Sequence, residues 1–185
     1  MPFFPSLPDD ANVASIFAQR PEYYGPWVGM TQTLMRGESP LSVAERELIA
    51  AWVSKVNECP YCHGGHAAAA TILGYDAAIF DQLSADIETA DVDDRMKPIL
   101  RYVRKLAREP HKMVQADADA VFAAGWDERA LHDAIAIACV FSYMNRLTLG
   151  HGIAAIPEQF EARGRRHVEQ GYDSQYAAIK DAGAG

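Results

Sequence analysis

Residues 42–66 read SVAERELIAAWVSKVNECPYCHGGH, a stretch that contains a helix start signal, an apolar stripe and two cysteines. Ser42 followed three positions later by Glu45 is the capping-box pattern of a helix N-terminus. The apolar residues that follow recur at the i, i+3, i+4 spacing of a core-facing helix: Leu48, Ile49, Trp52, Val53 and Val56. The stretch therefore predicts a buried helix over residues 42–57, followed by a second helix that begins near residue 60.

A second line of side chains runs beside that stripe and consists of Glu47, Ala51 and Ser54. The small residues leave room for another element to approach, and Glu47 would face it. Two interpretations of Glu47 stay open: a solvated first-turn carboxylate favoured by the helix dipole, or a carboxylate turned toward the neighbouring element. Further on, Gly64 and Gly65 weaken a helix, so they indicate close packing or irregular backbone near the cysteines.

The segment ECPYCHGGH (58–66) fits three different chemistries. C-x-x-C-H is the haem-attachment pattern, with His63 as the iron ligand, but that chemistry normally belongs to exported proteins. A structural zinc site needs four converging ligands, usually as two pairs on separate segments, and the sequence has no second C-x-x-C or H-x-x-x-H pair. Both metal-centred interpretations are therefore disfavoured.

The third chemistry, a redox-active dithiol, needs only the cysteine pair. Cys59 and Cys62 stand at i and i+3 near a helix start, which places both sulfurs on one face, and Pro60 suits the first helical position. The N–H groups and dipole of a helix N-terminus stabilise a thiolate and lower its pKa from about 8.5 toward neutrality. His66 falls on the same face, where it can take or relay a proton. We therefore expect a dithiol that cycles with its disulfide, with no metal and no organic cofactor.

The composition restricts the class of protein. The chain has 185 residues, 49% hydrophobic and 23% charged, which fits one globular domain with its own core. A formal net charge of −8, without a basic stripe interleaved with aromatics, argues against nucleic acid as a partner. The N-terminal segment lacks the basic and apolar regions of a secretory signal, which predicts a cytoplasmic protein. No apolar run reaches the roughly 18 residues of a membrane span, so we expect no membrane association.

Other conspicuous residues have ordinary interpretations. Cys139, within the apolar run AIAIACVF (134–141), is expected to pack in the core, as are Phe141 and Met144. The stretch EYYGPW (22–27) either lines an apolar entrance or packs against the core. Three further histidines are interpreted as ordinary helix or cap residues: His132, His151 and His167.

Helical periodicity dominates the chain, and no run of β-branched residues alternates with polar ones. The expected class is therefore all-α. Ten helices are predicted, separated by short turns rich in glycine and proline: residues 12–19, 22–36, 42–57, 60–73, 76–84, 93–107, 114–124, 127–149, 157–169 and 172–180.

Two longer stretches, LMRGESPLSVAERELIAAWVSKVNECPYCHGGH (34–66) and ALHDAIAIACVFSYMNRLTLGHGI (130–153), resemble the AhpD-like proteins. These form the alkylhydroperoxidase D and carboxymuconolactone decarboxylase superfamily, and the resemblance is nearest to the branch called peroxidase-related. It covers most of residues 22–152. Its diagnostic pattern is a glutamate, eleven residues, C-x-x-C, and a histidine four positions after the second cysteine. Glu47, Cys59, Cys62 and His66 satisfy that pattern.

The resemblance implies a function and a role for each residue of the pattern. Cys62 would be the peroxidatic thiol that attacks a hydroperoxide, and Cys59 the resolving thiol. His66 and Glu47 would form the proton relay that ionises Cys62, and an external dithiol would reduce the disulfide. The resemblance further implies one AhpD-like domain over residues 1–185, with a core at about 22–152 and packed extensions, assembled as a trimer or hexamer.

One position departs from the pattern. Well-characterised members have a histidine just before the second cysteine, where this chain has Tyr61, a poor proton shuttle. His63 follows Cys62 instead, on another side of a regular helix. Tyr61 and His63 are therefore considered as possible auxiliary residues. The helix terminus favours Cys59 as the more acidic thiol, whereas the family pattern favours Cys62 through its relay, and we follow the family pattern.

Two alternatives to the peroxidase remain. One is a metal-binding or non-catalytic oligomer on the same fold, and the other is a general dithiol-disulfide oxidoreductase with weak peroxidase activity.

Overall fold

A computed structural model describes residues 1–183, and this part of the chain is helical without a β-strand. The predicted all-α class is therefore confirmed. The helices are α1 (Val13–Phe17), α2 (Pro21–Arg36), α3 (Val43–Val56), α4 (Pro60–Ile72), α5 (Ile79–Ala85), α6 (Met96–Arg108), α7 (Gln115–Ala123), α8 (Glu128–Gly150), α9 (Phe160–Gln175) and α10 (Ala177–Ala182), with short 3-10 turns at Pro110–Lys112 and Pro157–Gln159. Within residues 1–183, no helix combines the length and the apolar character needed to cross a membrane.

Most helix boundaries lie within three residues of the predicted ones. The clearest difference is near the C-terminus, where two helices were expected at 157–169 and 172–180. The expected interruption is present, because Gly171 has φ 62° and turns the chain, but helical structure resumes and continues to Gln175. Only glycine adopts this left-handed backbone without a Cβ penalty.

Helices α3 and α4 form a tight antiparallel pair. The Ser42 hydroxyl accepts the N–H of Glu45, and the Glu45 carboxylate accepts the N–H of Ser42, so the predicted capping box is confirmed. After α3 the chain reverses through Glu58, which has φ 56°, and Cys59 then becomes the N-cap of α4. Pro60 occupies the first helical position, as predicted.

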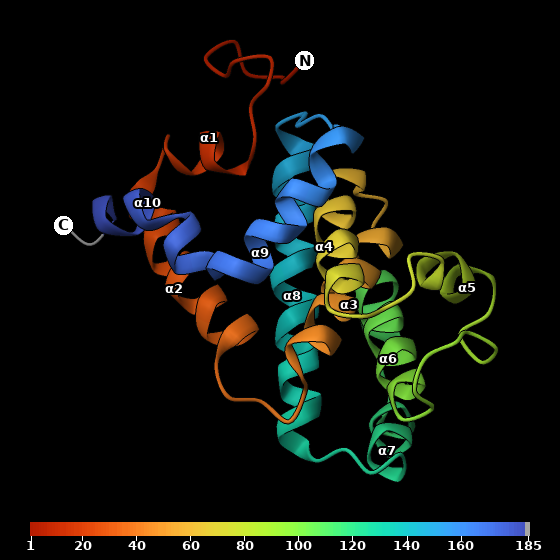
Figure 1. Ribbon diagram of the computed structural model, residues 1–185. Coiled ribbons are helices and arrows are strands. Elements are labelled where there is room, and N and C mark those ends of the chain that lie inside the picture. The colour runs from red at the N-terminus through yellow and green to blue at the C-terminus, as the bar shows by residue number, and fades with distance from the viewer. Residues whose placement is uncertain (184–185) are drawn as a thin grey trace.

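Helix α3 lies at the centre of the fold. It packs against α4, α6 and α8, and its residues from Leu48 to Val53 are all buried. Because neighbours surround α3, Glu47 is carried into the interior instead of facing solvent. In Figure 1, α4 lies between α3 and α9, while the two ends of the chain, α1–α2 and α10, gather on one side of the molecule.

Glycines allow α9 to approach α4 closely. A Cβ on Gly64 would lie 2.3 Å from the ring of Phe160, and a Cβ on Gly164 would lie 2.6 Å from the backbone nitrogen of Ala69. Close packing is therefore the reason for the glycine beside the cysteine pair. This approach brings the side chains of α9 to the buried sulfurs of α4.

The prediction for Cys139 is wrong, because its side chain is exposed. The run at 134–141 is apolar throughout, so its composition does not reveal which residues face inward. In α8 the buried face passes through Ala134, Ile137, Ala138 and Phe141, which leaves position 139 on the outer side.

Candidate active site

The two cysteines share one hydroxyl. Cys59 Sγ lies 3.3 Å and Cys62 Sγ lies 3.4 Å from Oγ1 of Thr148 on α8. Both thiols are free and buried, with 1% and 4% of their surface exposed. The hydroxyl can accept a hydrogen bond from one thiol, while its own proton lies within reach of the other sulfur and of the backbone oxygens of Met144 and Asn145, so it suits a pair that holds one thiol and one thiolate.

A buried polar chain fixes α8 against α3 beside these sulfurs. Asn145, nearly one turn before Thr148, donates to the Ser54 hydroxyl at 3.0 Å and accepts from the Asn57 amide at 3.0 Å. Ser54 is one of the small residues in the line beside the apolar stripe. These bonds satisfy the buried amide and fix where Thr148 lies relative to the thiols.

The surroundings make Cys59 the more acidic thiol. The hydrogen bond from Cys62, together with the Thr148 hydroxyl and the N–H of Cys62, lowers the pKa of Cys59 to about 6 despite burial. The pKa of Cys62 is raised, because it donates to Cys59, is buried, and lies beside the negative charge of that sulfur. These contacts favour the thiolate on Cys59, at the N-cap of α4, and not on Cys62 as the family pattern led us to expect.

Glu47 and His66 form a buried pair next to the thiols. The Glu47 carboxylate accepts a hydrogen bond from His66 Nδ1 at 2.7 Å and another from Arg36 Nη2 at 2.6 Å, and it is 0% exposed. Burial alone would raise the pKa of Glu47, but the charge and hydrogen bond of His66 and the charge of Arg36 lower it to about 2. Glu47 is thus an ionised carboxylate that holds His66 Nδ1–H and leaves Nε2 for the cavity side.

Helix α9 supplies an aromatic stack that covers this pair. The ring of His167 stacks on His66 with 4.7 Å between the ring centroids, and the ring of Tyr172 stacks on His167 at 5.6 Å. Arg36 Nη2 also donates to the backbone oxygen of His167 at 2.7 Å, which ties α9 to Glu47. His167 lies within α9, as expected of a helix residue, and its side chain is buried against His66.

A small cavity of about 30 Å³, accessible to water-sized atoms, lies between these groups. It contains Cys62 and His66 in its wall but not Cys59. Phe141 and Met144, predicted to be core residues, are buried and also line the cavity. Trp27 is the residue of the EYYGPW stretch that lines it. The remaining wall residues are Val13, Tyr61, Arg163, His167, Tyr172 and Tyr176.

Tyr61 lies at the cavity, but its polar groups are already engaged. Its hydroxyl accepts the N–H of Val13 at 3.2 Å, and the guanidinium of Arg163 lies 3.7 Å from the ring centre and donates to the Tyr61 carbonyl. His63 faces elsewhere, with Nδ1 3.0 Å from the carbonyl of Ala51 and its ring against Phe80. Of the two possible auxiliary residues, only Tyr61 is therefore brought to the cavity.

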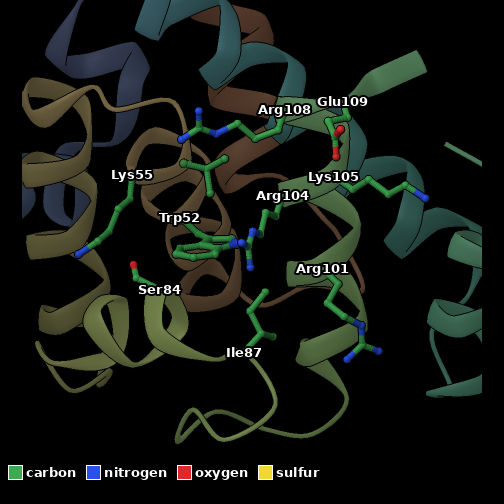
Figure 2. Close-up of a pocket in the computed structure, with 10 residues that line it drawn as sticks. Trp52, Lys55, Ser84, Ile87, Arg101, Arg104, Lys105, Arg108 and Glu109 are labelled. Carbon is green, nitrogen blue, oxygen red and sulfur yellow. The ribbon is translucent and has the colours of Figure 1, made fainter. Parts of the chain in front are cut away.

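A larger groove of about 550 Å³ lies elsewhere, between α3, α5 and α6. Figure 2 shows the indole of Trp52 in this groove with Lys55 and the basic side chains of α6 around it. Four of its cations pair with carboxylates: Lys55 with Asp81, Arg101 with Glu88, Lys105 with Asp117, and Arg108 with Glu58. Neither cysteine nor His66 lines this groove, so the candidate chemistry lies in the smaller cavity.

The site thus contains predicted and unpredicted residues. The four residues of the diagnostic pattern come together around the two sulfurs and the cavity. Spacing along the sequence did not indicate the others, since they come from distant segments: Arg36, Thr148, Arg163, His167 and Tyr172. Among residues 1–183, no three His, Cys, Asp or Glu side chains converge in an arrangement that could hold a metal ion.

Residues 21–104 match the model of the carboxymuconolactone decarboxylase family. The chain is similar to the crystal structure of an uncharacterized peroxidase-related protein from Silicibacter sp. TM1040, with 30% identity, a TM-score of 0.73, and coverage of 80% of this chain and 78% of that one. It is also similar to an uncharacterized peroxidase-related protein from Ralstonia eutropha JMP134, described as an alkylhydroperoxidase AhpD core, with 27% identity, a TM-score of 0.72, and coverage of 81% and 78%. No curated protein matches the chain.

Proposed function

Because the chain belongs to the carboxymuconolactone decarboxylase family and shares its helical fold with AhpD-like peroxidase-related proteins, we propose that it is a thiol-dependent hydroperoxide reductase. One observation supports the proposal more strongly than the others. Cys62 and His66 line the same buried cavity, and the ring of His66 is held by the ionised carboxylate of Glu47. A nucleophile, a proton carrier and the group that orients it are thus arranged around space for a reactant.

The reaction begins with a proton exchange between the sulfurs. The resting pair holds one thiolate, mainly on Cys59, and one proton, mainly on Cys62. Transfer of that proton to Cys59, or to Nε2 of His66, gives a Cys62 thiolate facing the cavity. Both routes are short, because the two sulfurs share the hydroxyl of Thr148 and His66 lies one turn along the same helix.

The Cys62 thiolate then attacks the hydroperoxide. A bond forms between Cys62 Sγ and the nearer peroxide oxygen, the O–O bond breaks, and the other oxygen leaves with the electron pair and takes a proton to become an alcohol or water. Cys62 is oxidised by two electrons to a sulfenic acid. Cys59 next attacks that sulfur, the sulfenic oxygen leaves as water, and a disulfide between the two cysteines results.

Return to the starting state needs an external dithiol. Its first thiolate attacks the disulfide and its second thiol resolves the mixed disulfide, so both cysteines are reduced and the partner is oxidised. Tyr61 does not have to move protons in this scheme, because its hydroxyl is engaged by Val13 and the relay consists of His66 and Glu47.

The decisive experiment measures hydroperoxide consumption with an added dithiol for wild type, Cys59→Ser, Cys62→Ser and Cys139→Ser. The first two variants should lose turnover, while Cys139→Ser should retain it, because this exposed residue lies outside the cavity. Cys59→Ser should also accumulate a Cys62 sulfenic acid that a sulfenic-acid reagent traps. Turnover at the wild-type rate in both Cys59→Ser and Cys62→Ser would disprove the proposal.

One observation favours a second candidate, a general dithiol-disulfide oxidoreductase. The more acidic thiol is Cys59, the first cysteine of C-x-x-C at a helix N-terminus, and such thiols attack disulfides. The two functions differ in their oxidant. Rapid disulfide exchange with a small disulfide, together with slow oxidation by hydroperoxides, would favour this candidate over the peroxidase.

A further inference from the structure

Two of the residues that line the cavity each carry a buried polar atom with no hydrogen-bond partner among residues 1–183. These atoms are Nε2 of His167 and the hydroxyl of Tyr172, on side chains of residues that are only 4% and 3% exposed. A buried donor without a partner lowers stability, because folding removes its hydrogen bonds to water and supplies none in return. A small molecule that entered the cavity and accepted these hydrogen bonds would restore part of that stability.

The neighbours of His167 determine which of its nitrogens carries the proton. The amide nitrogen of Gln175 lies 3.1 Å from His167 Nδ1 and also donates to the carbonyl of Gly171, so Nδ1 accepts a hydrogen bond. Burial, and then the charge of His66, lower the pKa of His167 well below its usual value, so the ring is neutral. A neutral imidazole that accepts at Nδ1 carries its proton on Nε2. His167 therefore presents an N–H donor.

The residues that carry these donors line the same cavity as the thiol of Cys62. His66, His167 and Tyr172 form one continuous stack, and all three line the cavity together with Cys62. The cavity of about 30 Å³ exceeds the roughly 10–15 Å³ that one water-sized oxygen atom needs, so it suits a reactant of very few atoms. Hydrogen peroxide consists of two such oxygen atoms.

We propose that His167 and Tyr172 form a subsite for the leaving oxygen of hydrogen peroxide, and that this peroxide is the preferred substrate. This inference rests on the proposed function. As Cys62 Sγ bonds to one oxygen and the O–O bond breaks, the other oxygen gains negative charge. The N–H of His167 and the O–H of Tyr172 donate to that oxygen, which becomes water when it takes the proton carried by the relay. Cys62 becomes a sulfenic acid, as in the scheme above.

Donors that face a developing oxyanion in a buried site have a large effect on rate, and loss of one such donor typically costs about 10²- to 10³-fold. Tyr172→Phe removes only the hydroxyl and keeps the ring in the stack. His167→Gln retains an amide N–H near the position of Nε2, whereas His167→Leu has no donor. Oxidation by hydrogen peroxide should therefore slow in Tyr172→Phe and His167→Leu, and His167→Gln should recover part of the rate.

Single-turnover loss of free thiols is measured with two oxidants, hydrogen peroxide and diamide, the second of which oxidises a dithiol without an O–O bond. Tyr172→Phe should be at least about tenfold slower than wild type with the peroxide and unchanged with diamide. Wild type should also react faster with hydrogen peroxide than with cumene hydroperoxide, whose aryl group exceeds the cavity.

The outcomes separate the two proposals. If wild type resists hydrogen peroxide while diamide oxidises its thiols, the peroxidase function fails, and the subsite fails with it. If wild type reacts with peroxide and Tyr172→Phe and His167→Leu react equally fast, only the subsite is disproved. Equal slowing with both oxidants would also overturn the subsite, because it would show a general loss of thiol reactivity.

Discussion

At the scale of single residues, the charge on Glu47 depends on its two hydrogen-bond partners, Arg36 and His66. The carboxylate is fully buried and lies between Arg36 and His66, which supply the only polar contacts in its immediate surroundings among the described residues. Without these partners, burial would favour the protonated acid. The same contacts orient His66 toward the cavity and attach α9 through Arg36, so one carboxylate supports both the relay and the wall of the site.

Replacing that carboxylate should therefore destabilise the fold as well as reduce activity. Glu47→Gln leaves the guanidinium of Arg36 without its counter-charge, and loss of one partner of a buried ion pair typically costs about 3–5 kcal/mol. Urea unfolding measures this loss, with the exposed Glu169→Gln as the control, which should change stability by less than about 0.5 kcal/mol. Equal stability of the two variants would contradict the role assigned to Glu47.

The stability of the protein should also fall in acid because of Glu47. Its pKa is lowered to about 2 in the folded protein, below the value of about 4.3 for an unperturbed glutamate. A lowered pKa contributes stability that is fully present above the unfolded value and is lost as pH falls through the folded value. Wild type should thus lose stability between about pH 4.3 and 2 relative to Glu47→Gln, which thermal unfolding across that range would measure.

The thiol pair leads to a second prediction, which concerns how the reactivity of Cys59 depends on pH. With the pKa of Cys59 lowered to about 6, alkylation by iodoacetamide should be fast at neutral pH and should decline as pH falls below that value. Cys62→Ala removes the hydrogen bond that contributes most to the shift, so the alkylation profile should move toward the usual thiol range near pH 8.5. A profile that is identical in wild type and Cys62→Ala would show that the two thiols are not coupled.

At the scale of helices, the part of the site carried by α3 and α4 was predictable and the part carried by α8 and α9 was not. The capping box, Pro60 and the C-x-x-C pair act through neighbours in sequence, so local spacing locates them. Thr148 and His167 reach the thiols only through tertiary packing, and nothing in their local sequence distinguishes them. The error at Cys139 has a related cause, because a run that is apolar at every position does not show which side of the helix faces the core.

The close contact of α4 with α9 can be tested by adding one methyl group. Gly164→Ala would place a Cβ 2.6 Å from the backbone nitrogen of Ala69, so α9 has to move. Overpacking of this kind costs about 1–3 kcal/mol, and displacement of His167 should also slow peroxide turnover. Gly150→Ala is the matched control, since its Cβ meets no atom within 4 Å and its stability should be unchanged or slightly higher. Equal melting temperatures for the two variants would contradict the close packing.

At the scale of the whole molecule, the chain has apolar surface that a partner copy could cover. Large apolar side chains are exposed on α2, α7 and α8, among them Tyr23, Met30, Phe122, Tyr143 and Leu149. Assemblies of AhpD-like proteins led us to expect a trimer or hexamer, and burial of such side chains stabilises an interface by about 25 cal/mol per Å² of apolar area. Exposed apolar residues scattered singly are also normal, so their presence alone does not decide the assembly.

Light scattering coupled to size-exclusion chromatography decides the question, because the chain has a mass of 20.3 kDa and the expected species have three or six times that mass.

The cavity predicts how assembly relates to activity. All the residues that line it belong to one chain, and they come from α1, α2, α4, α8 and α9 together with Tyr176. Dilution that dissociates the oligomer should therefore leave single-turnover thiol oxidation by peroxide unchanged. A species of 20.3 kDa at micromolar concentration would contradict the expected assembly, and loss of thiol oxidation on dissociation would show that a neighbouring copy supports the site.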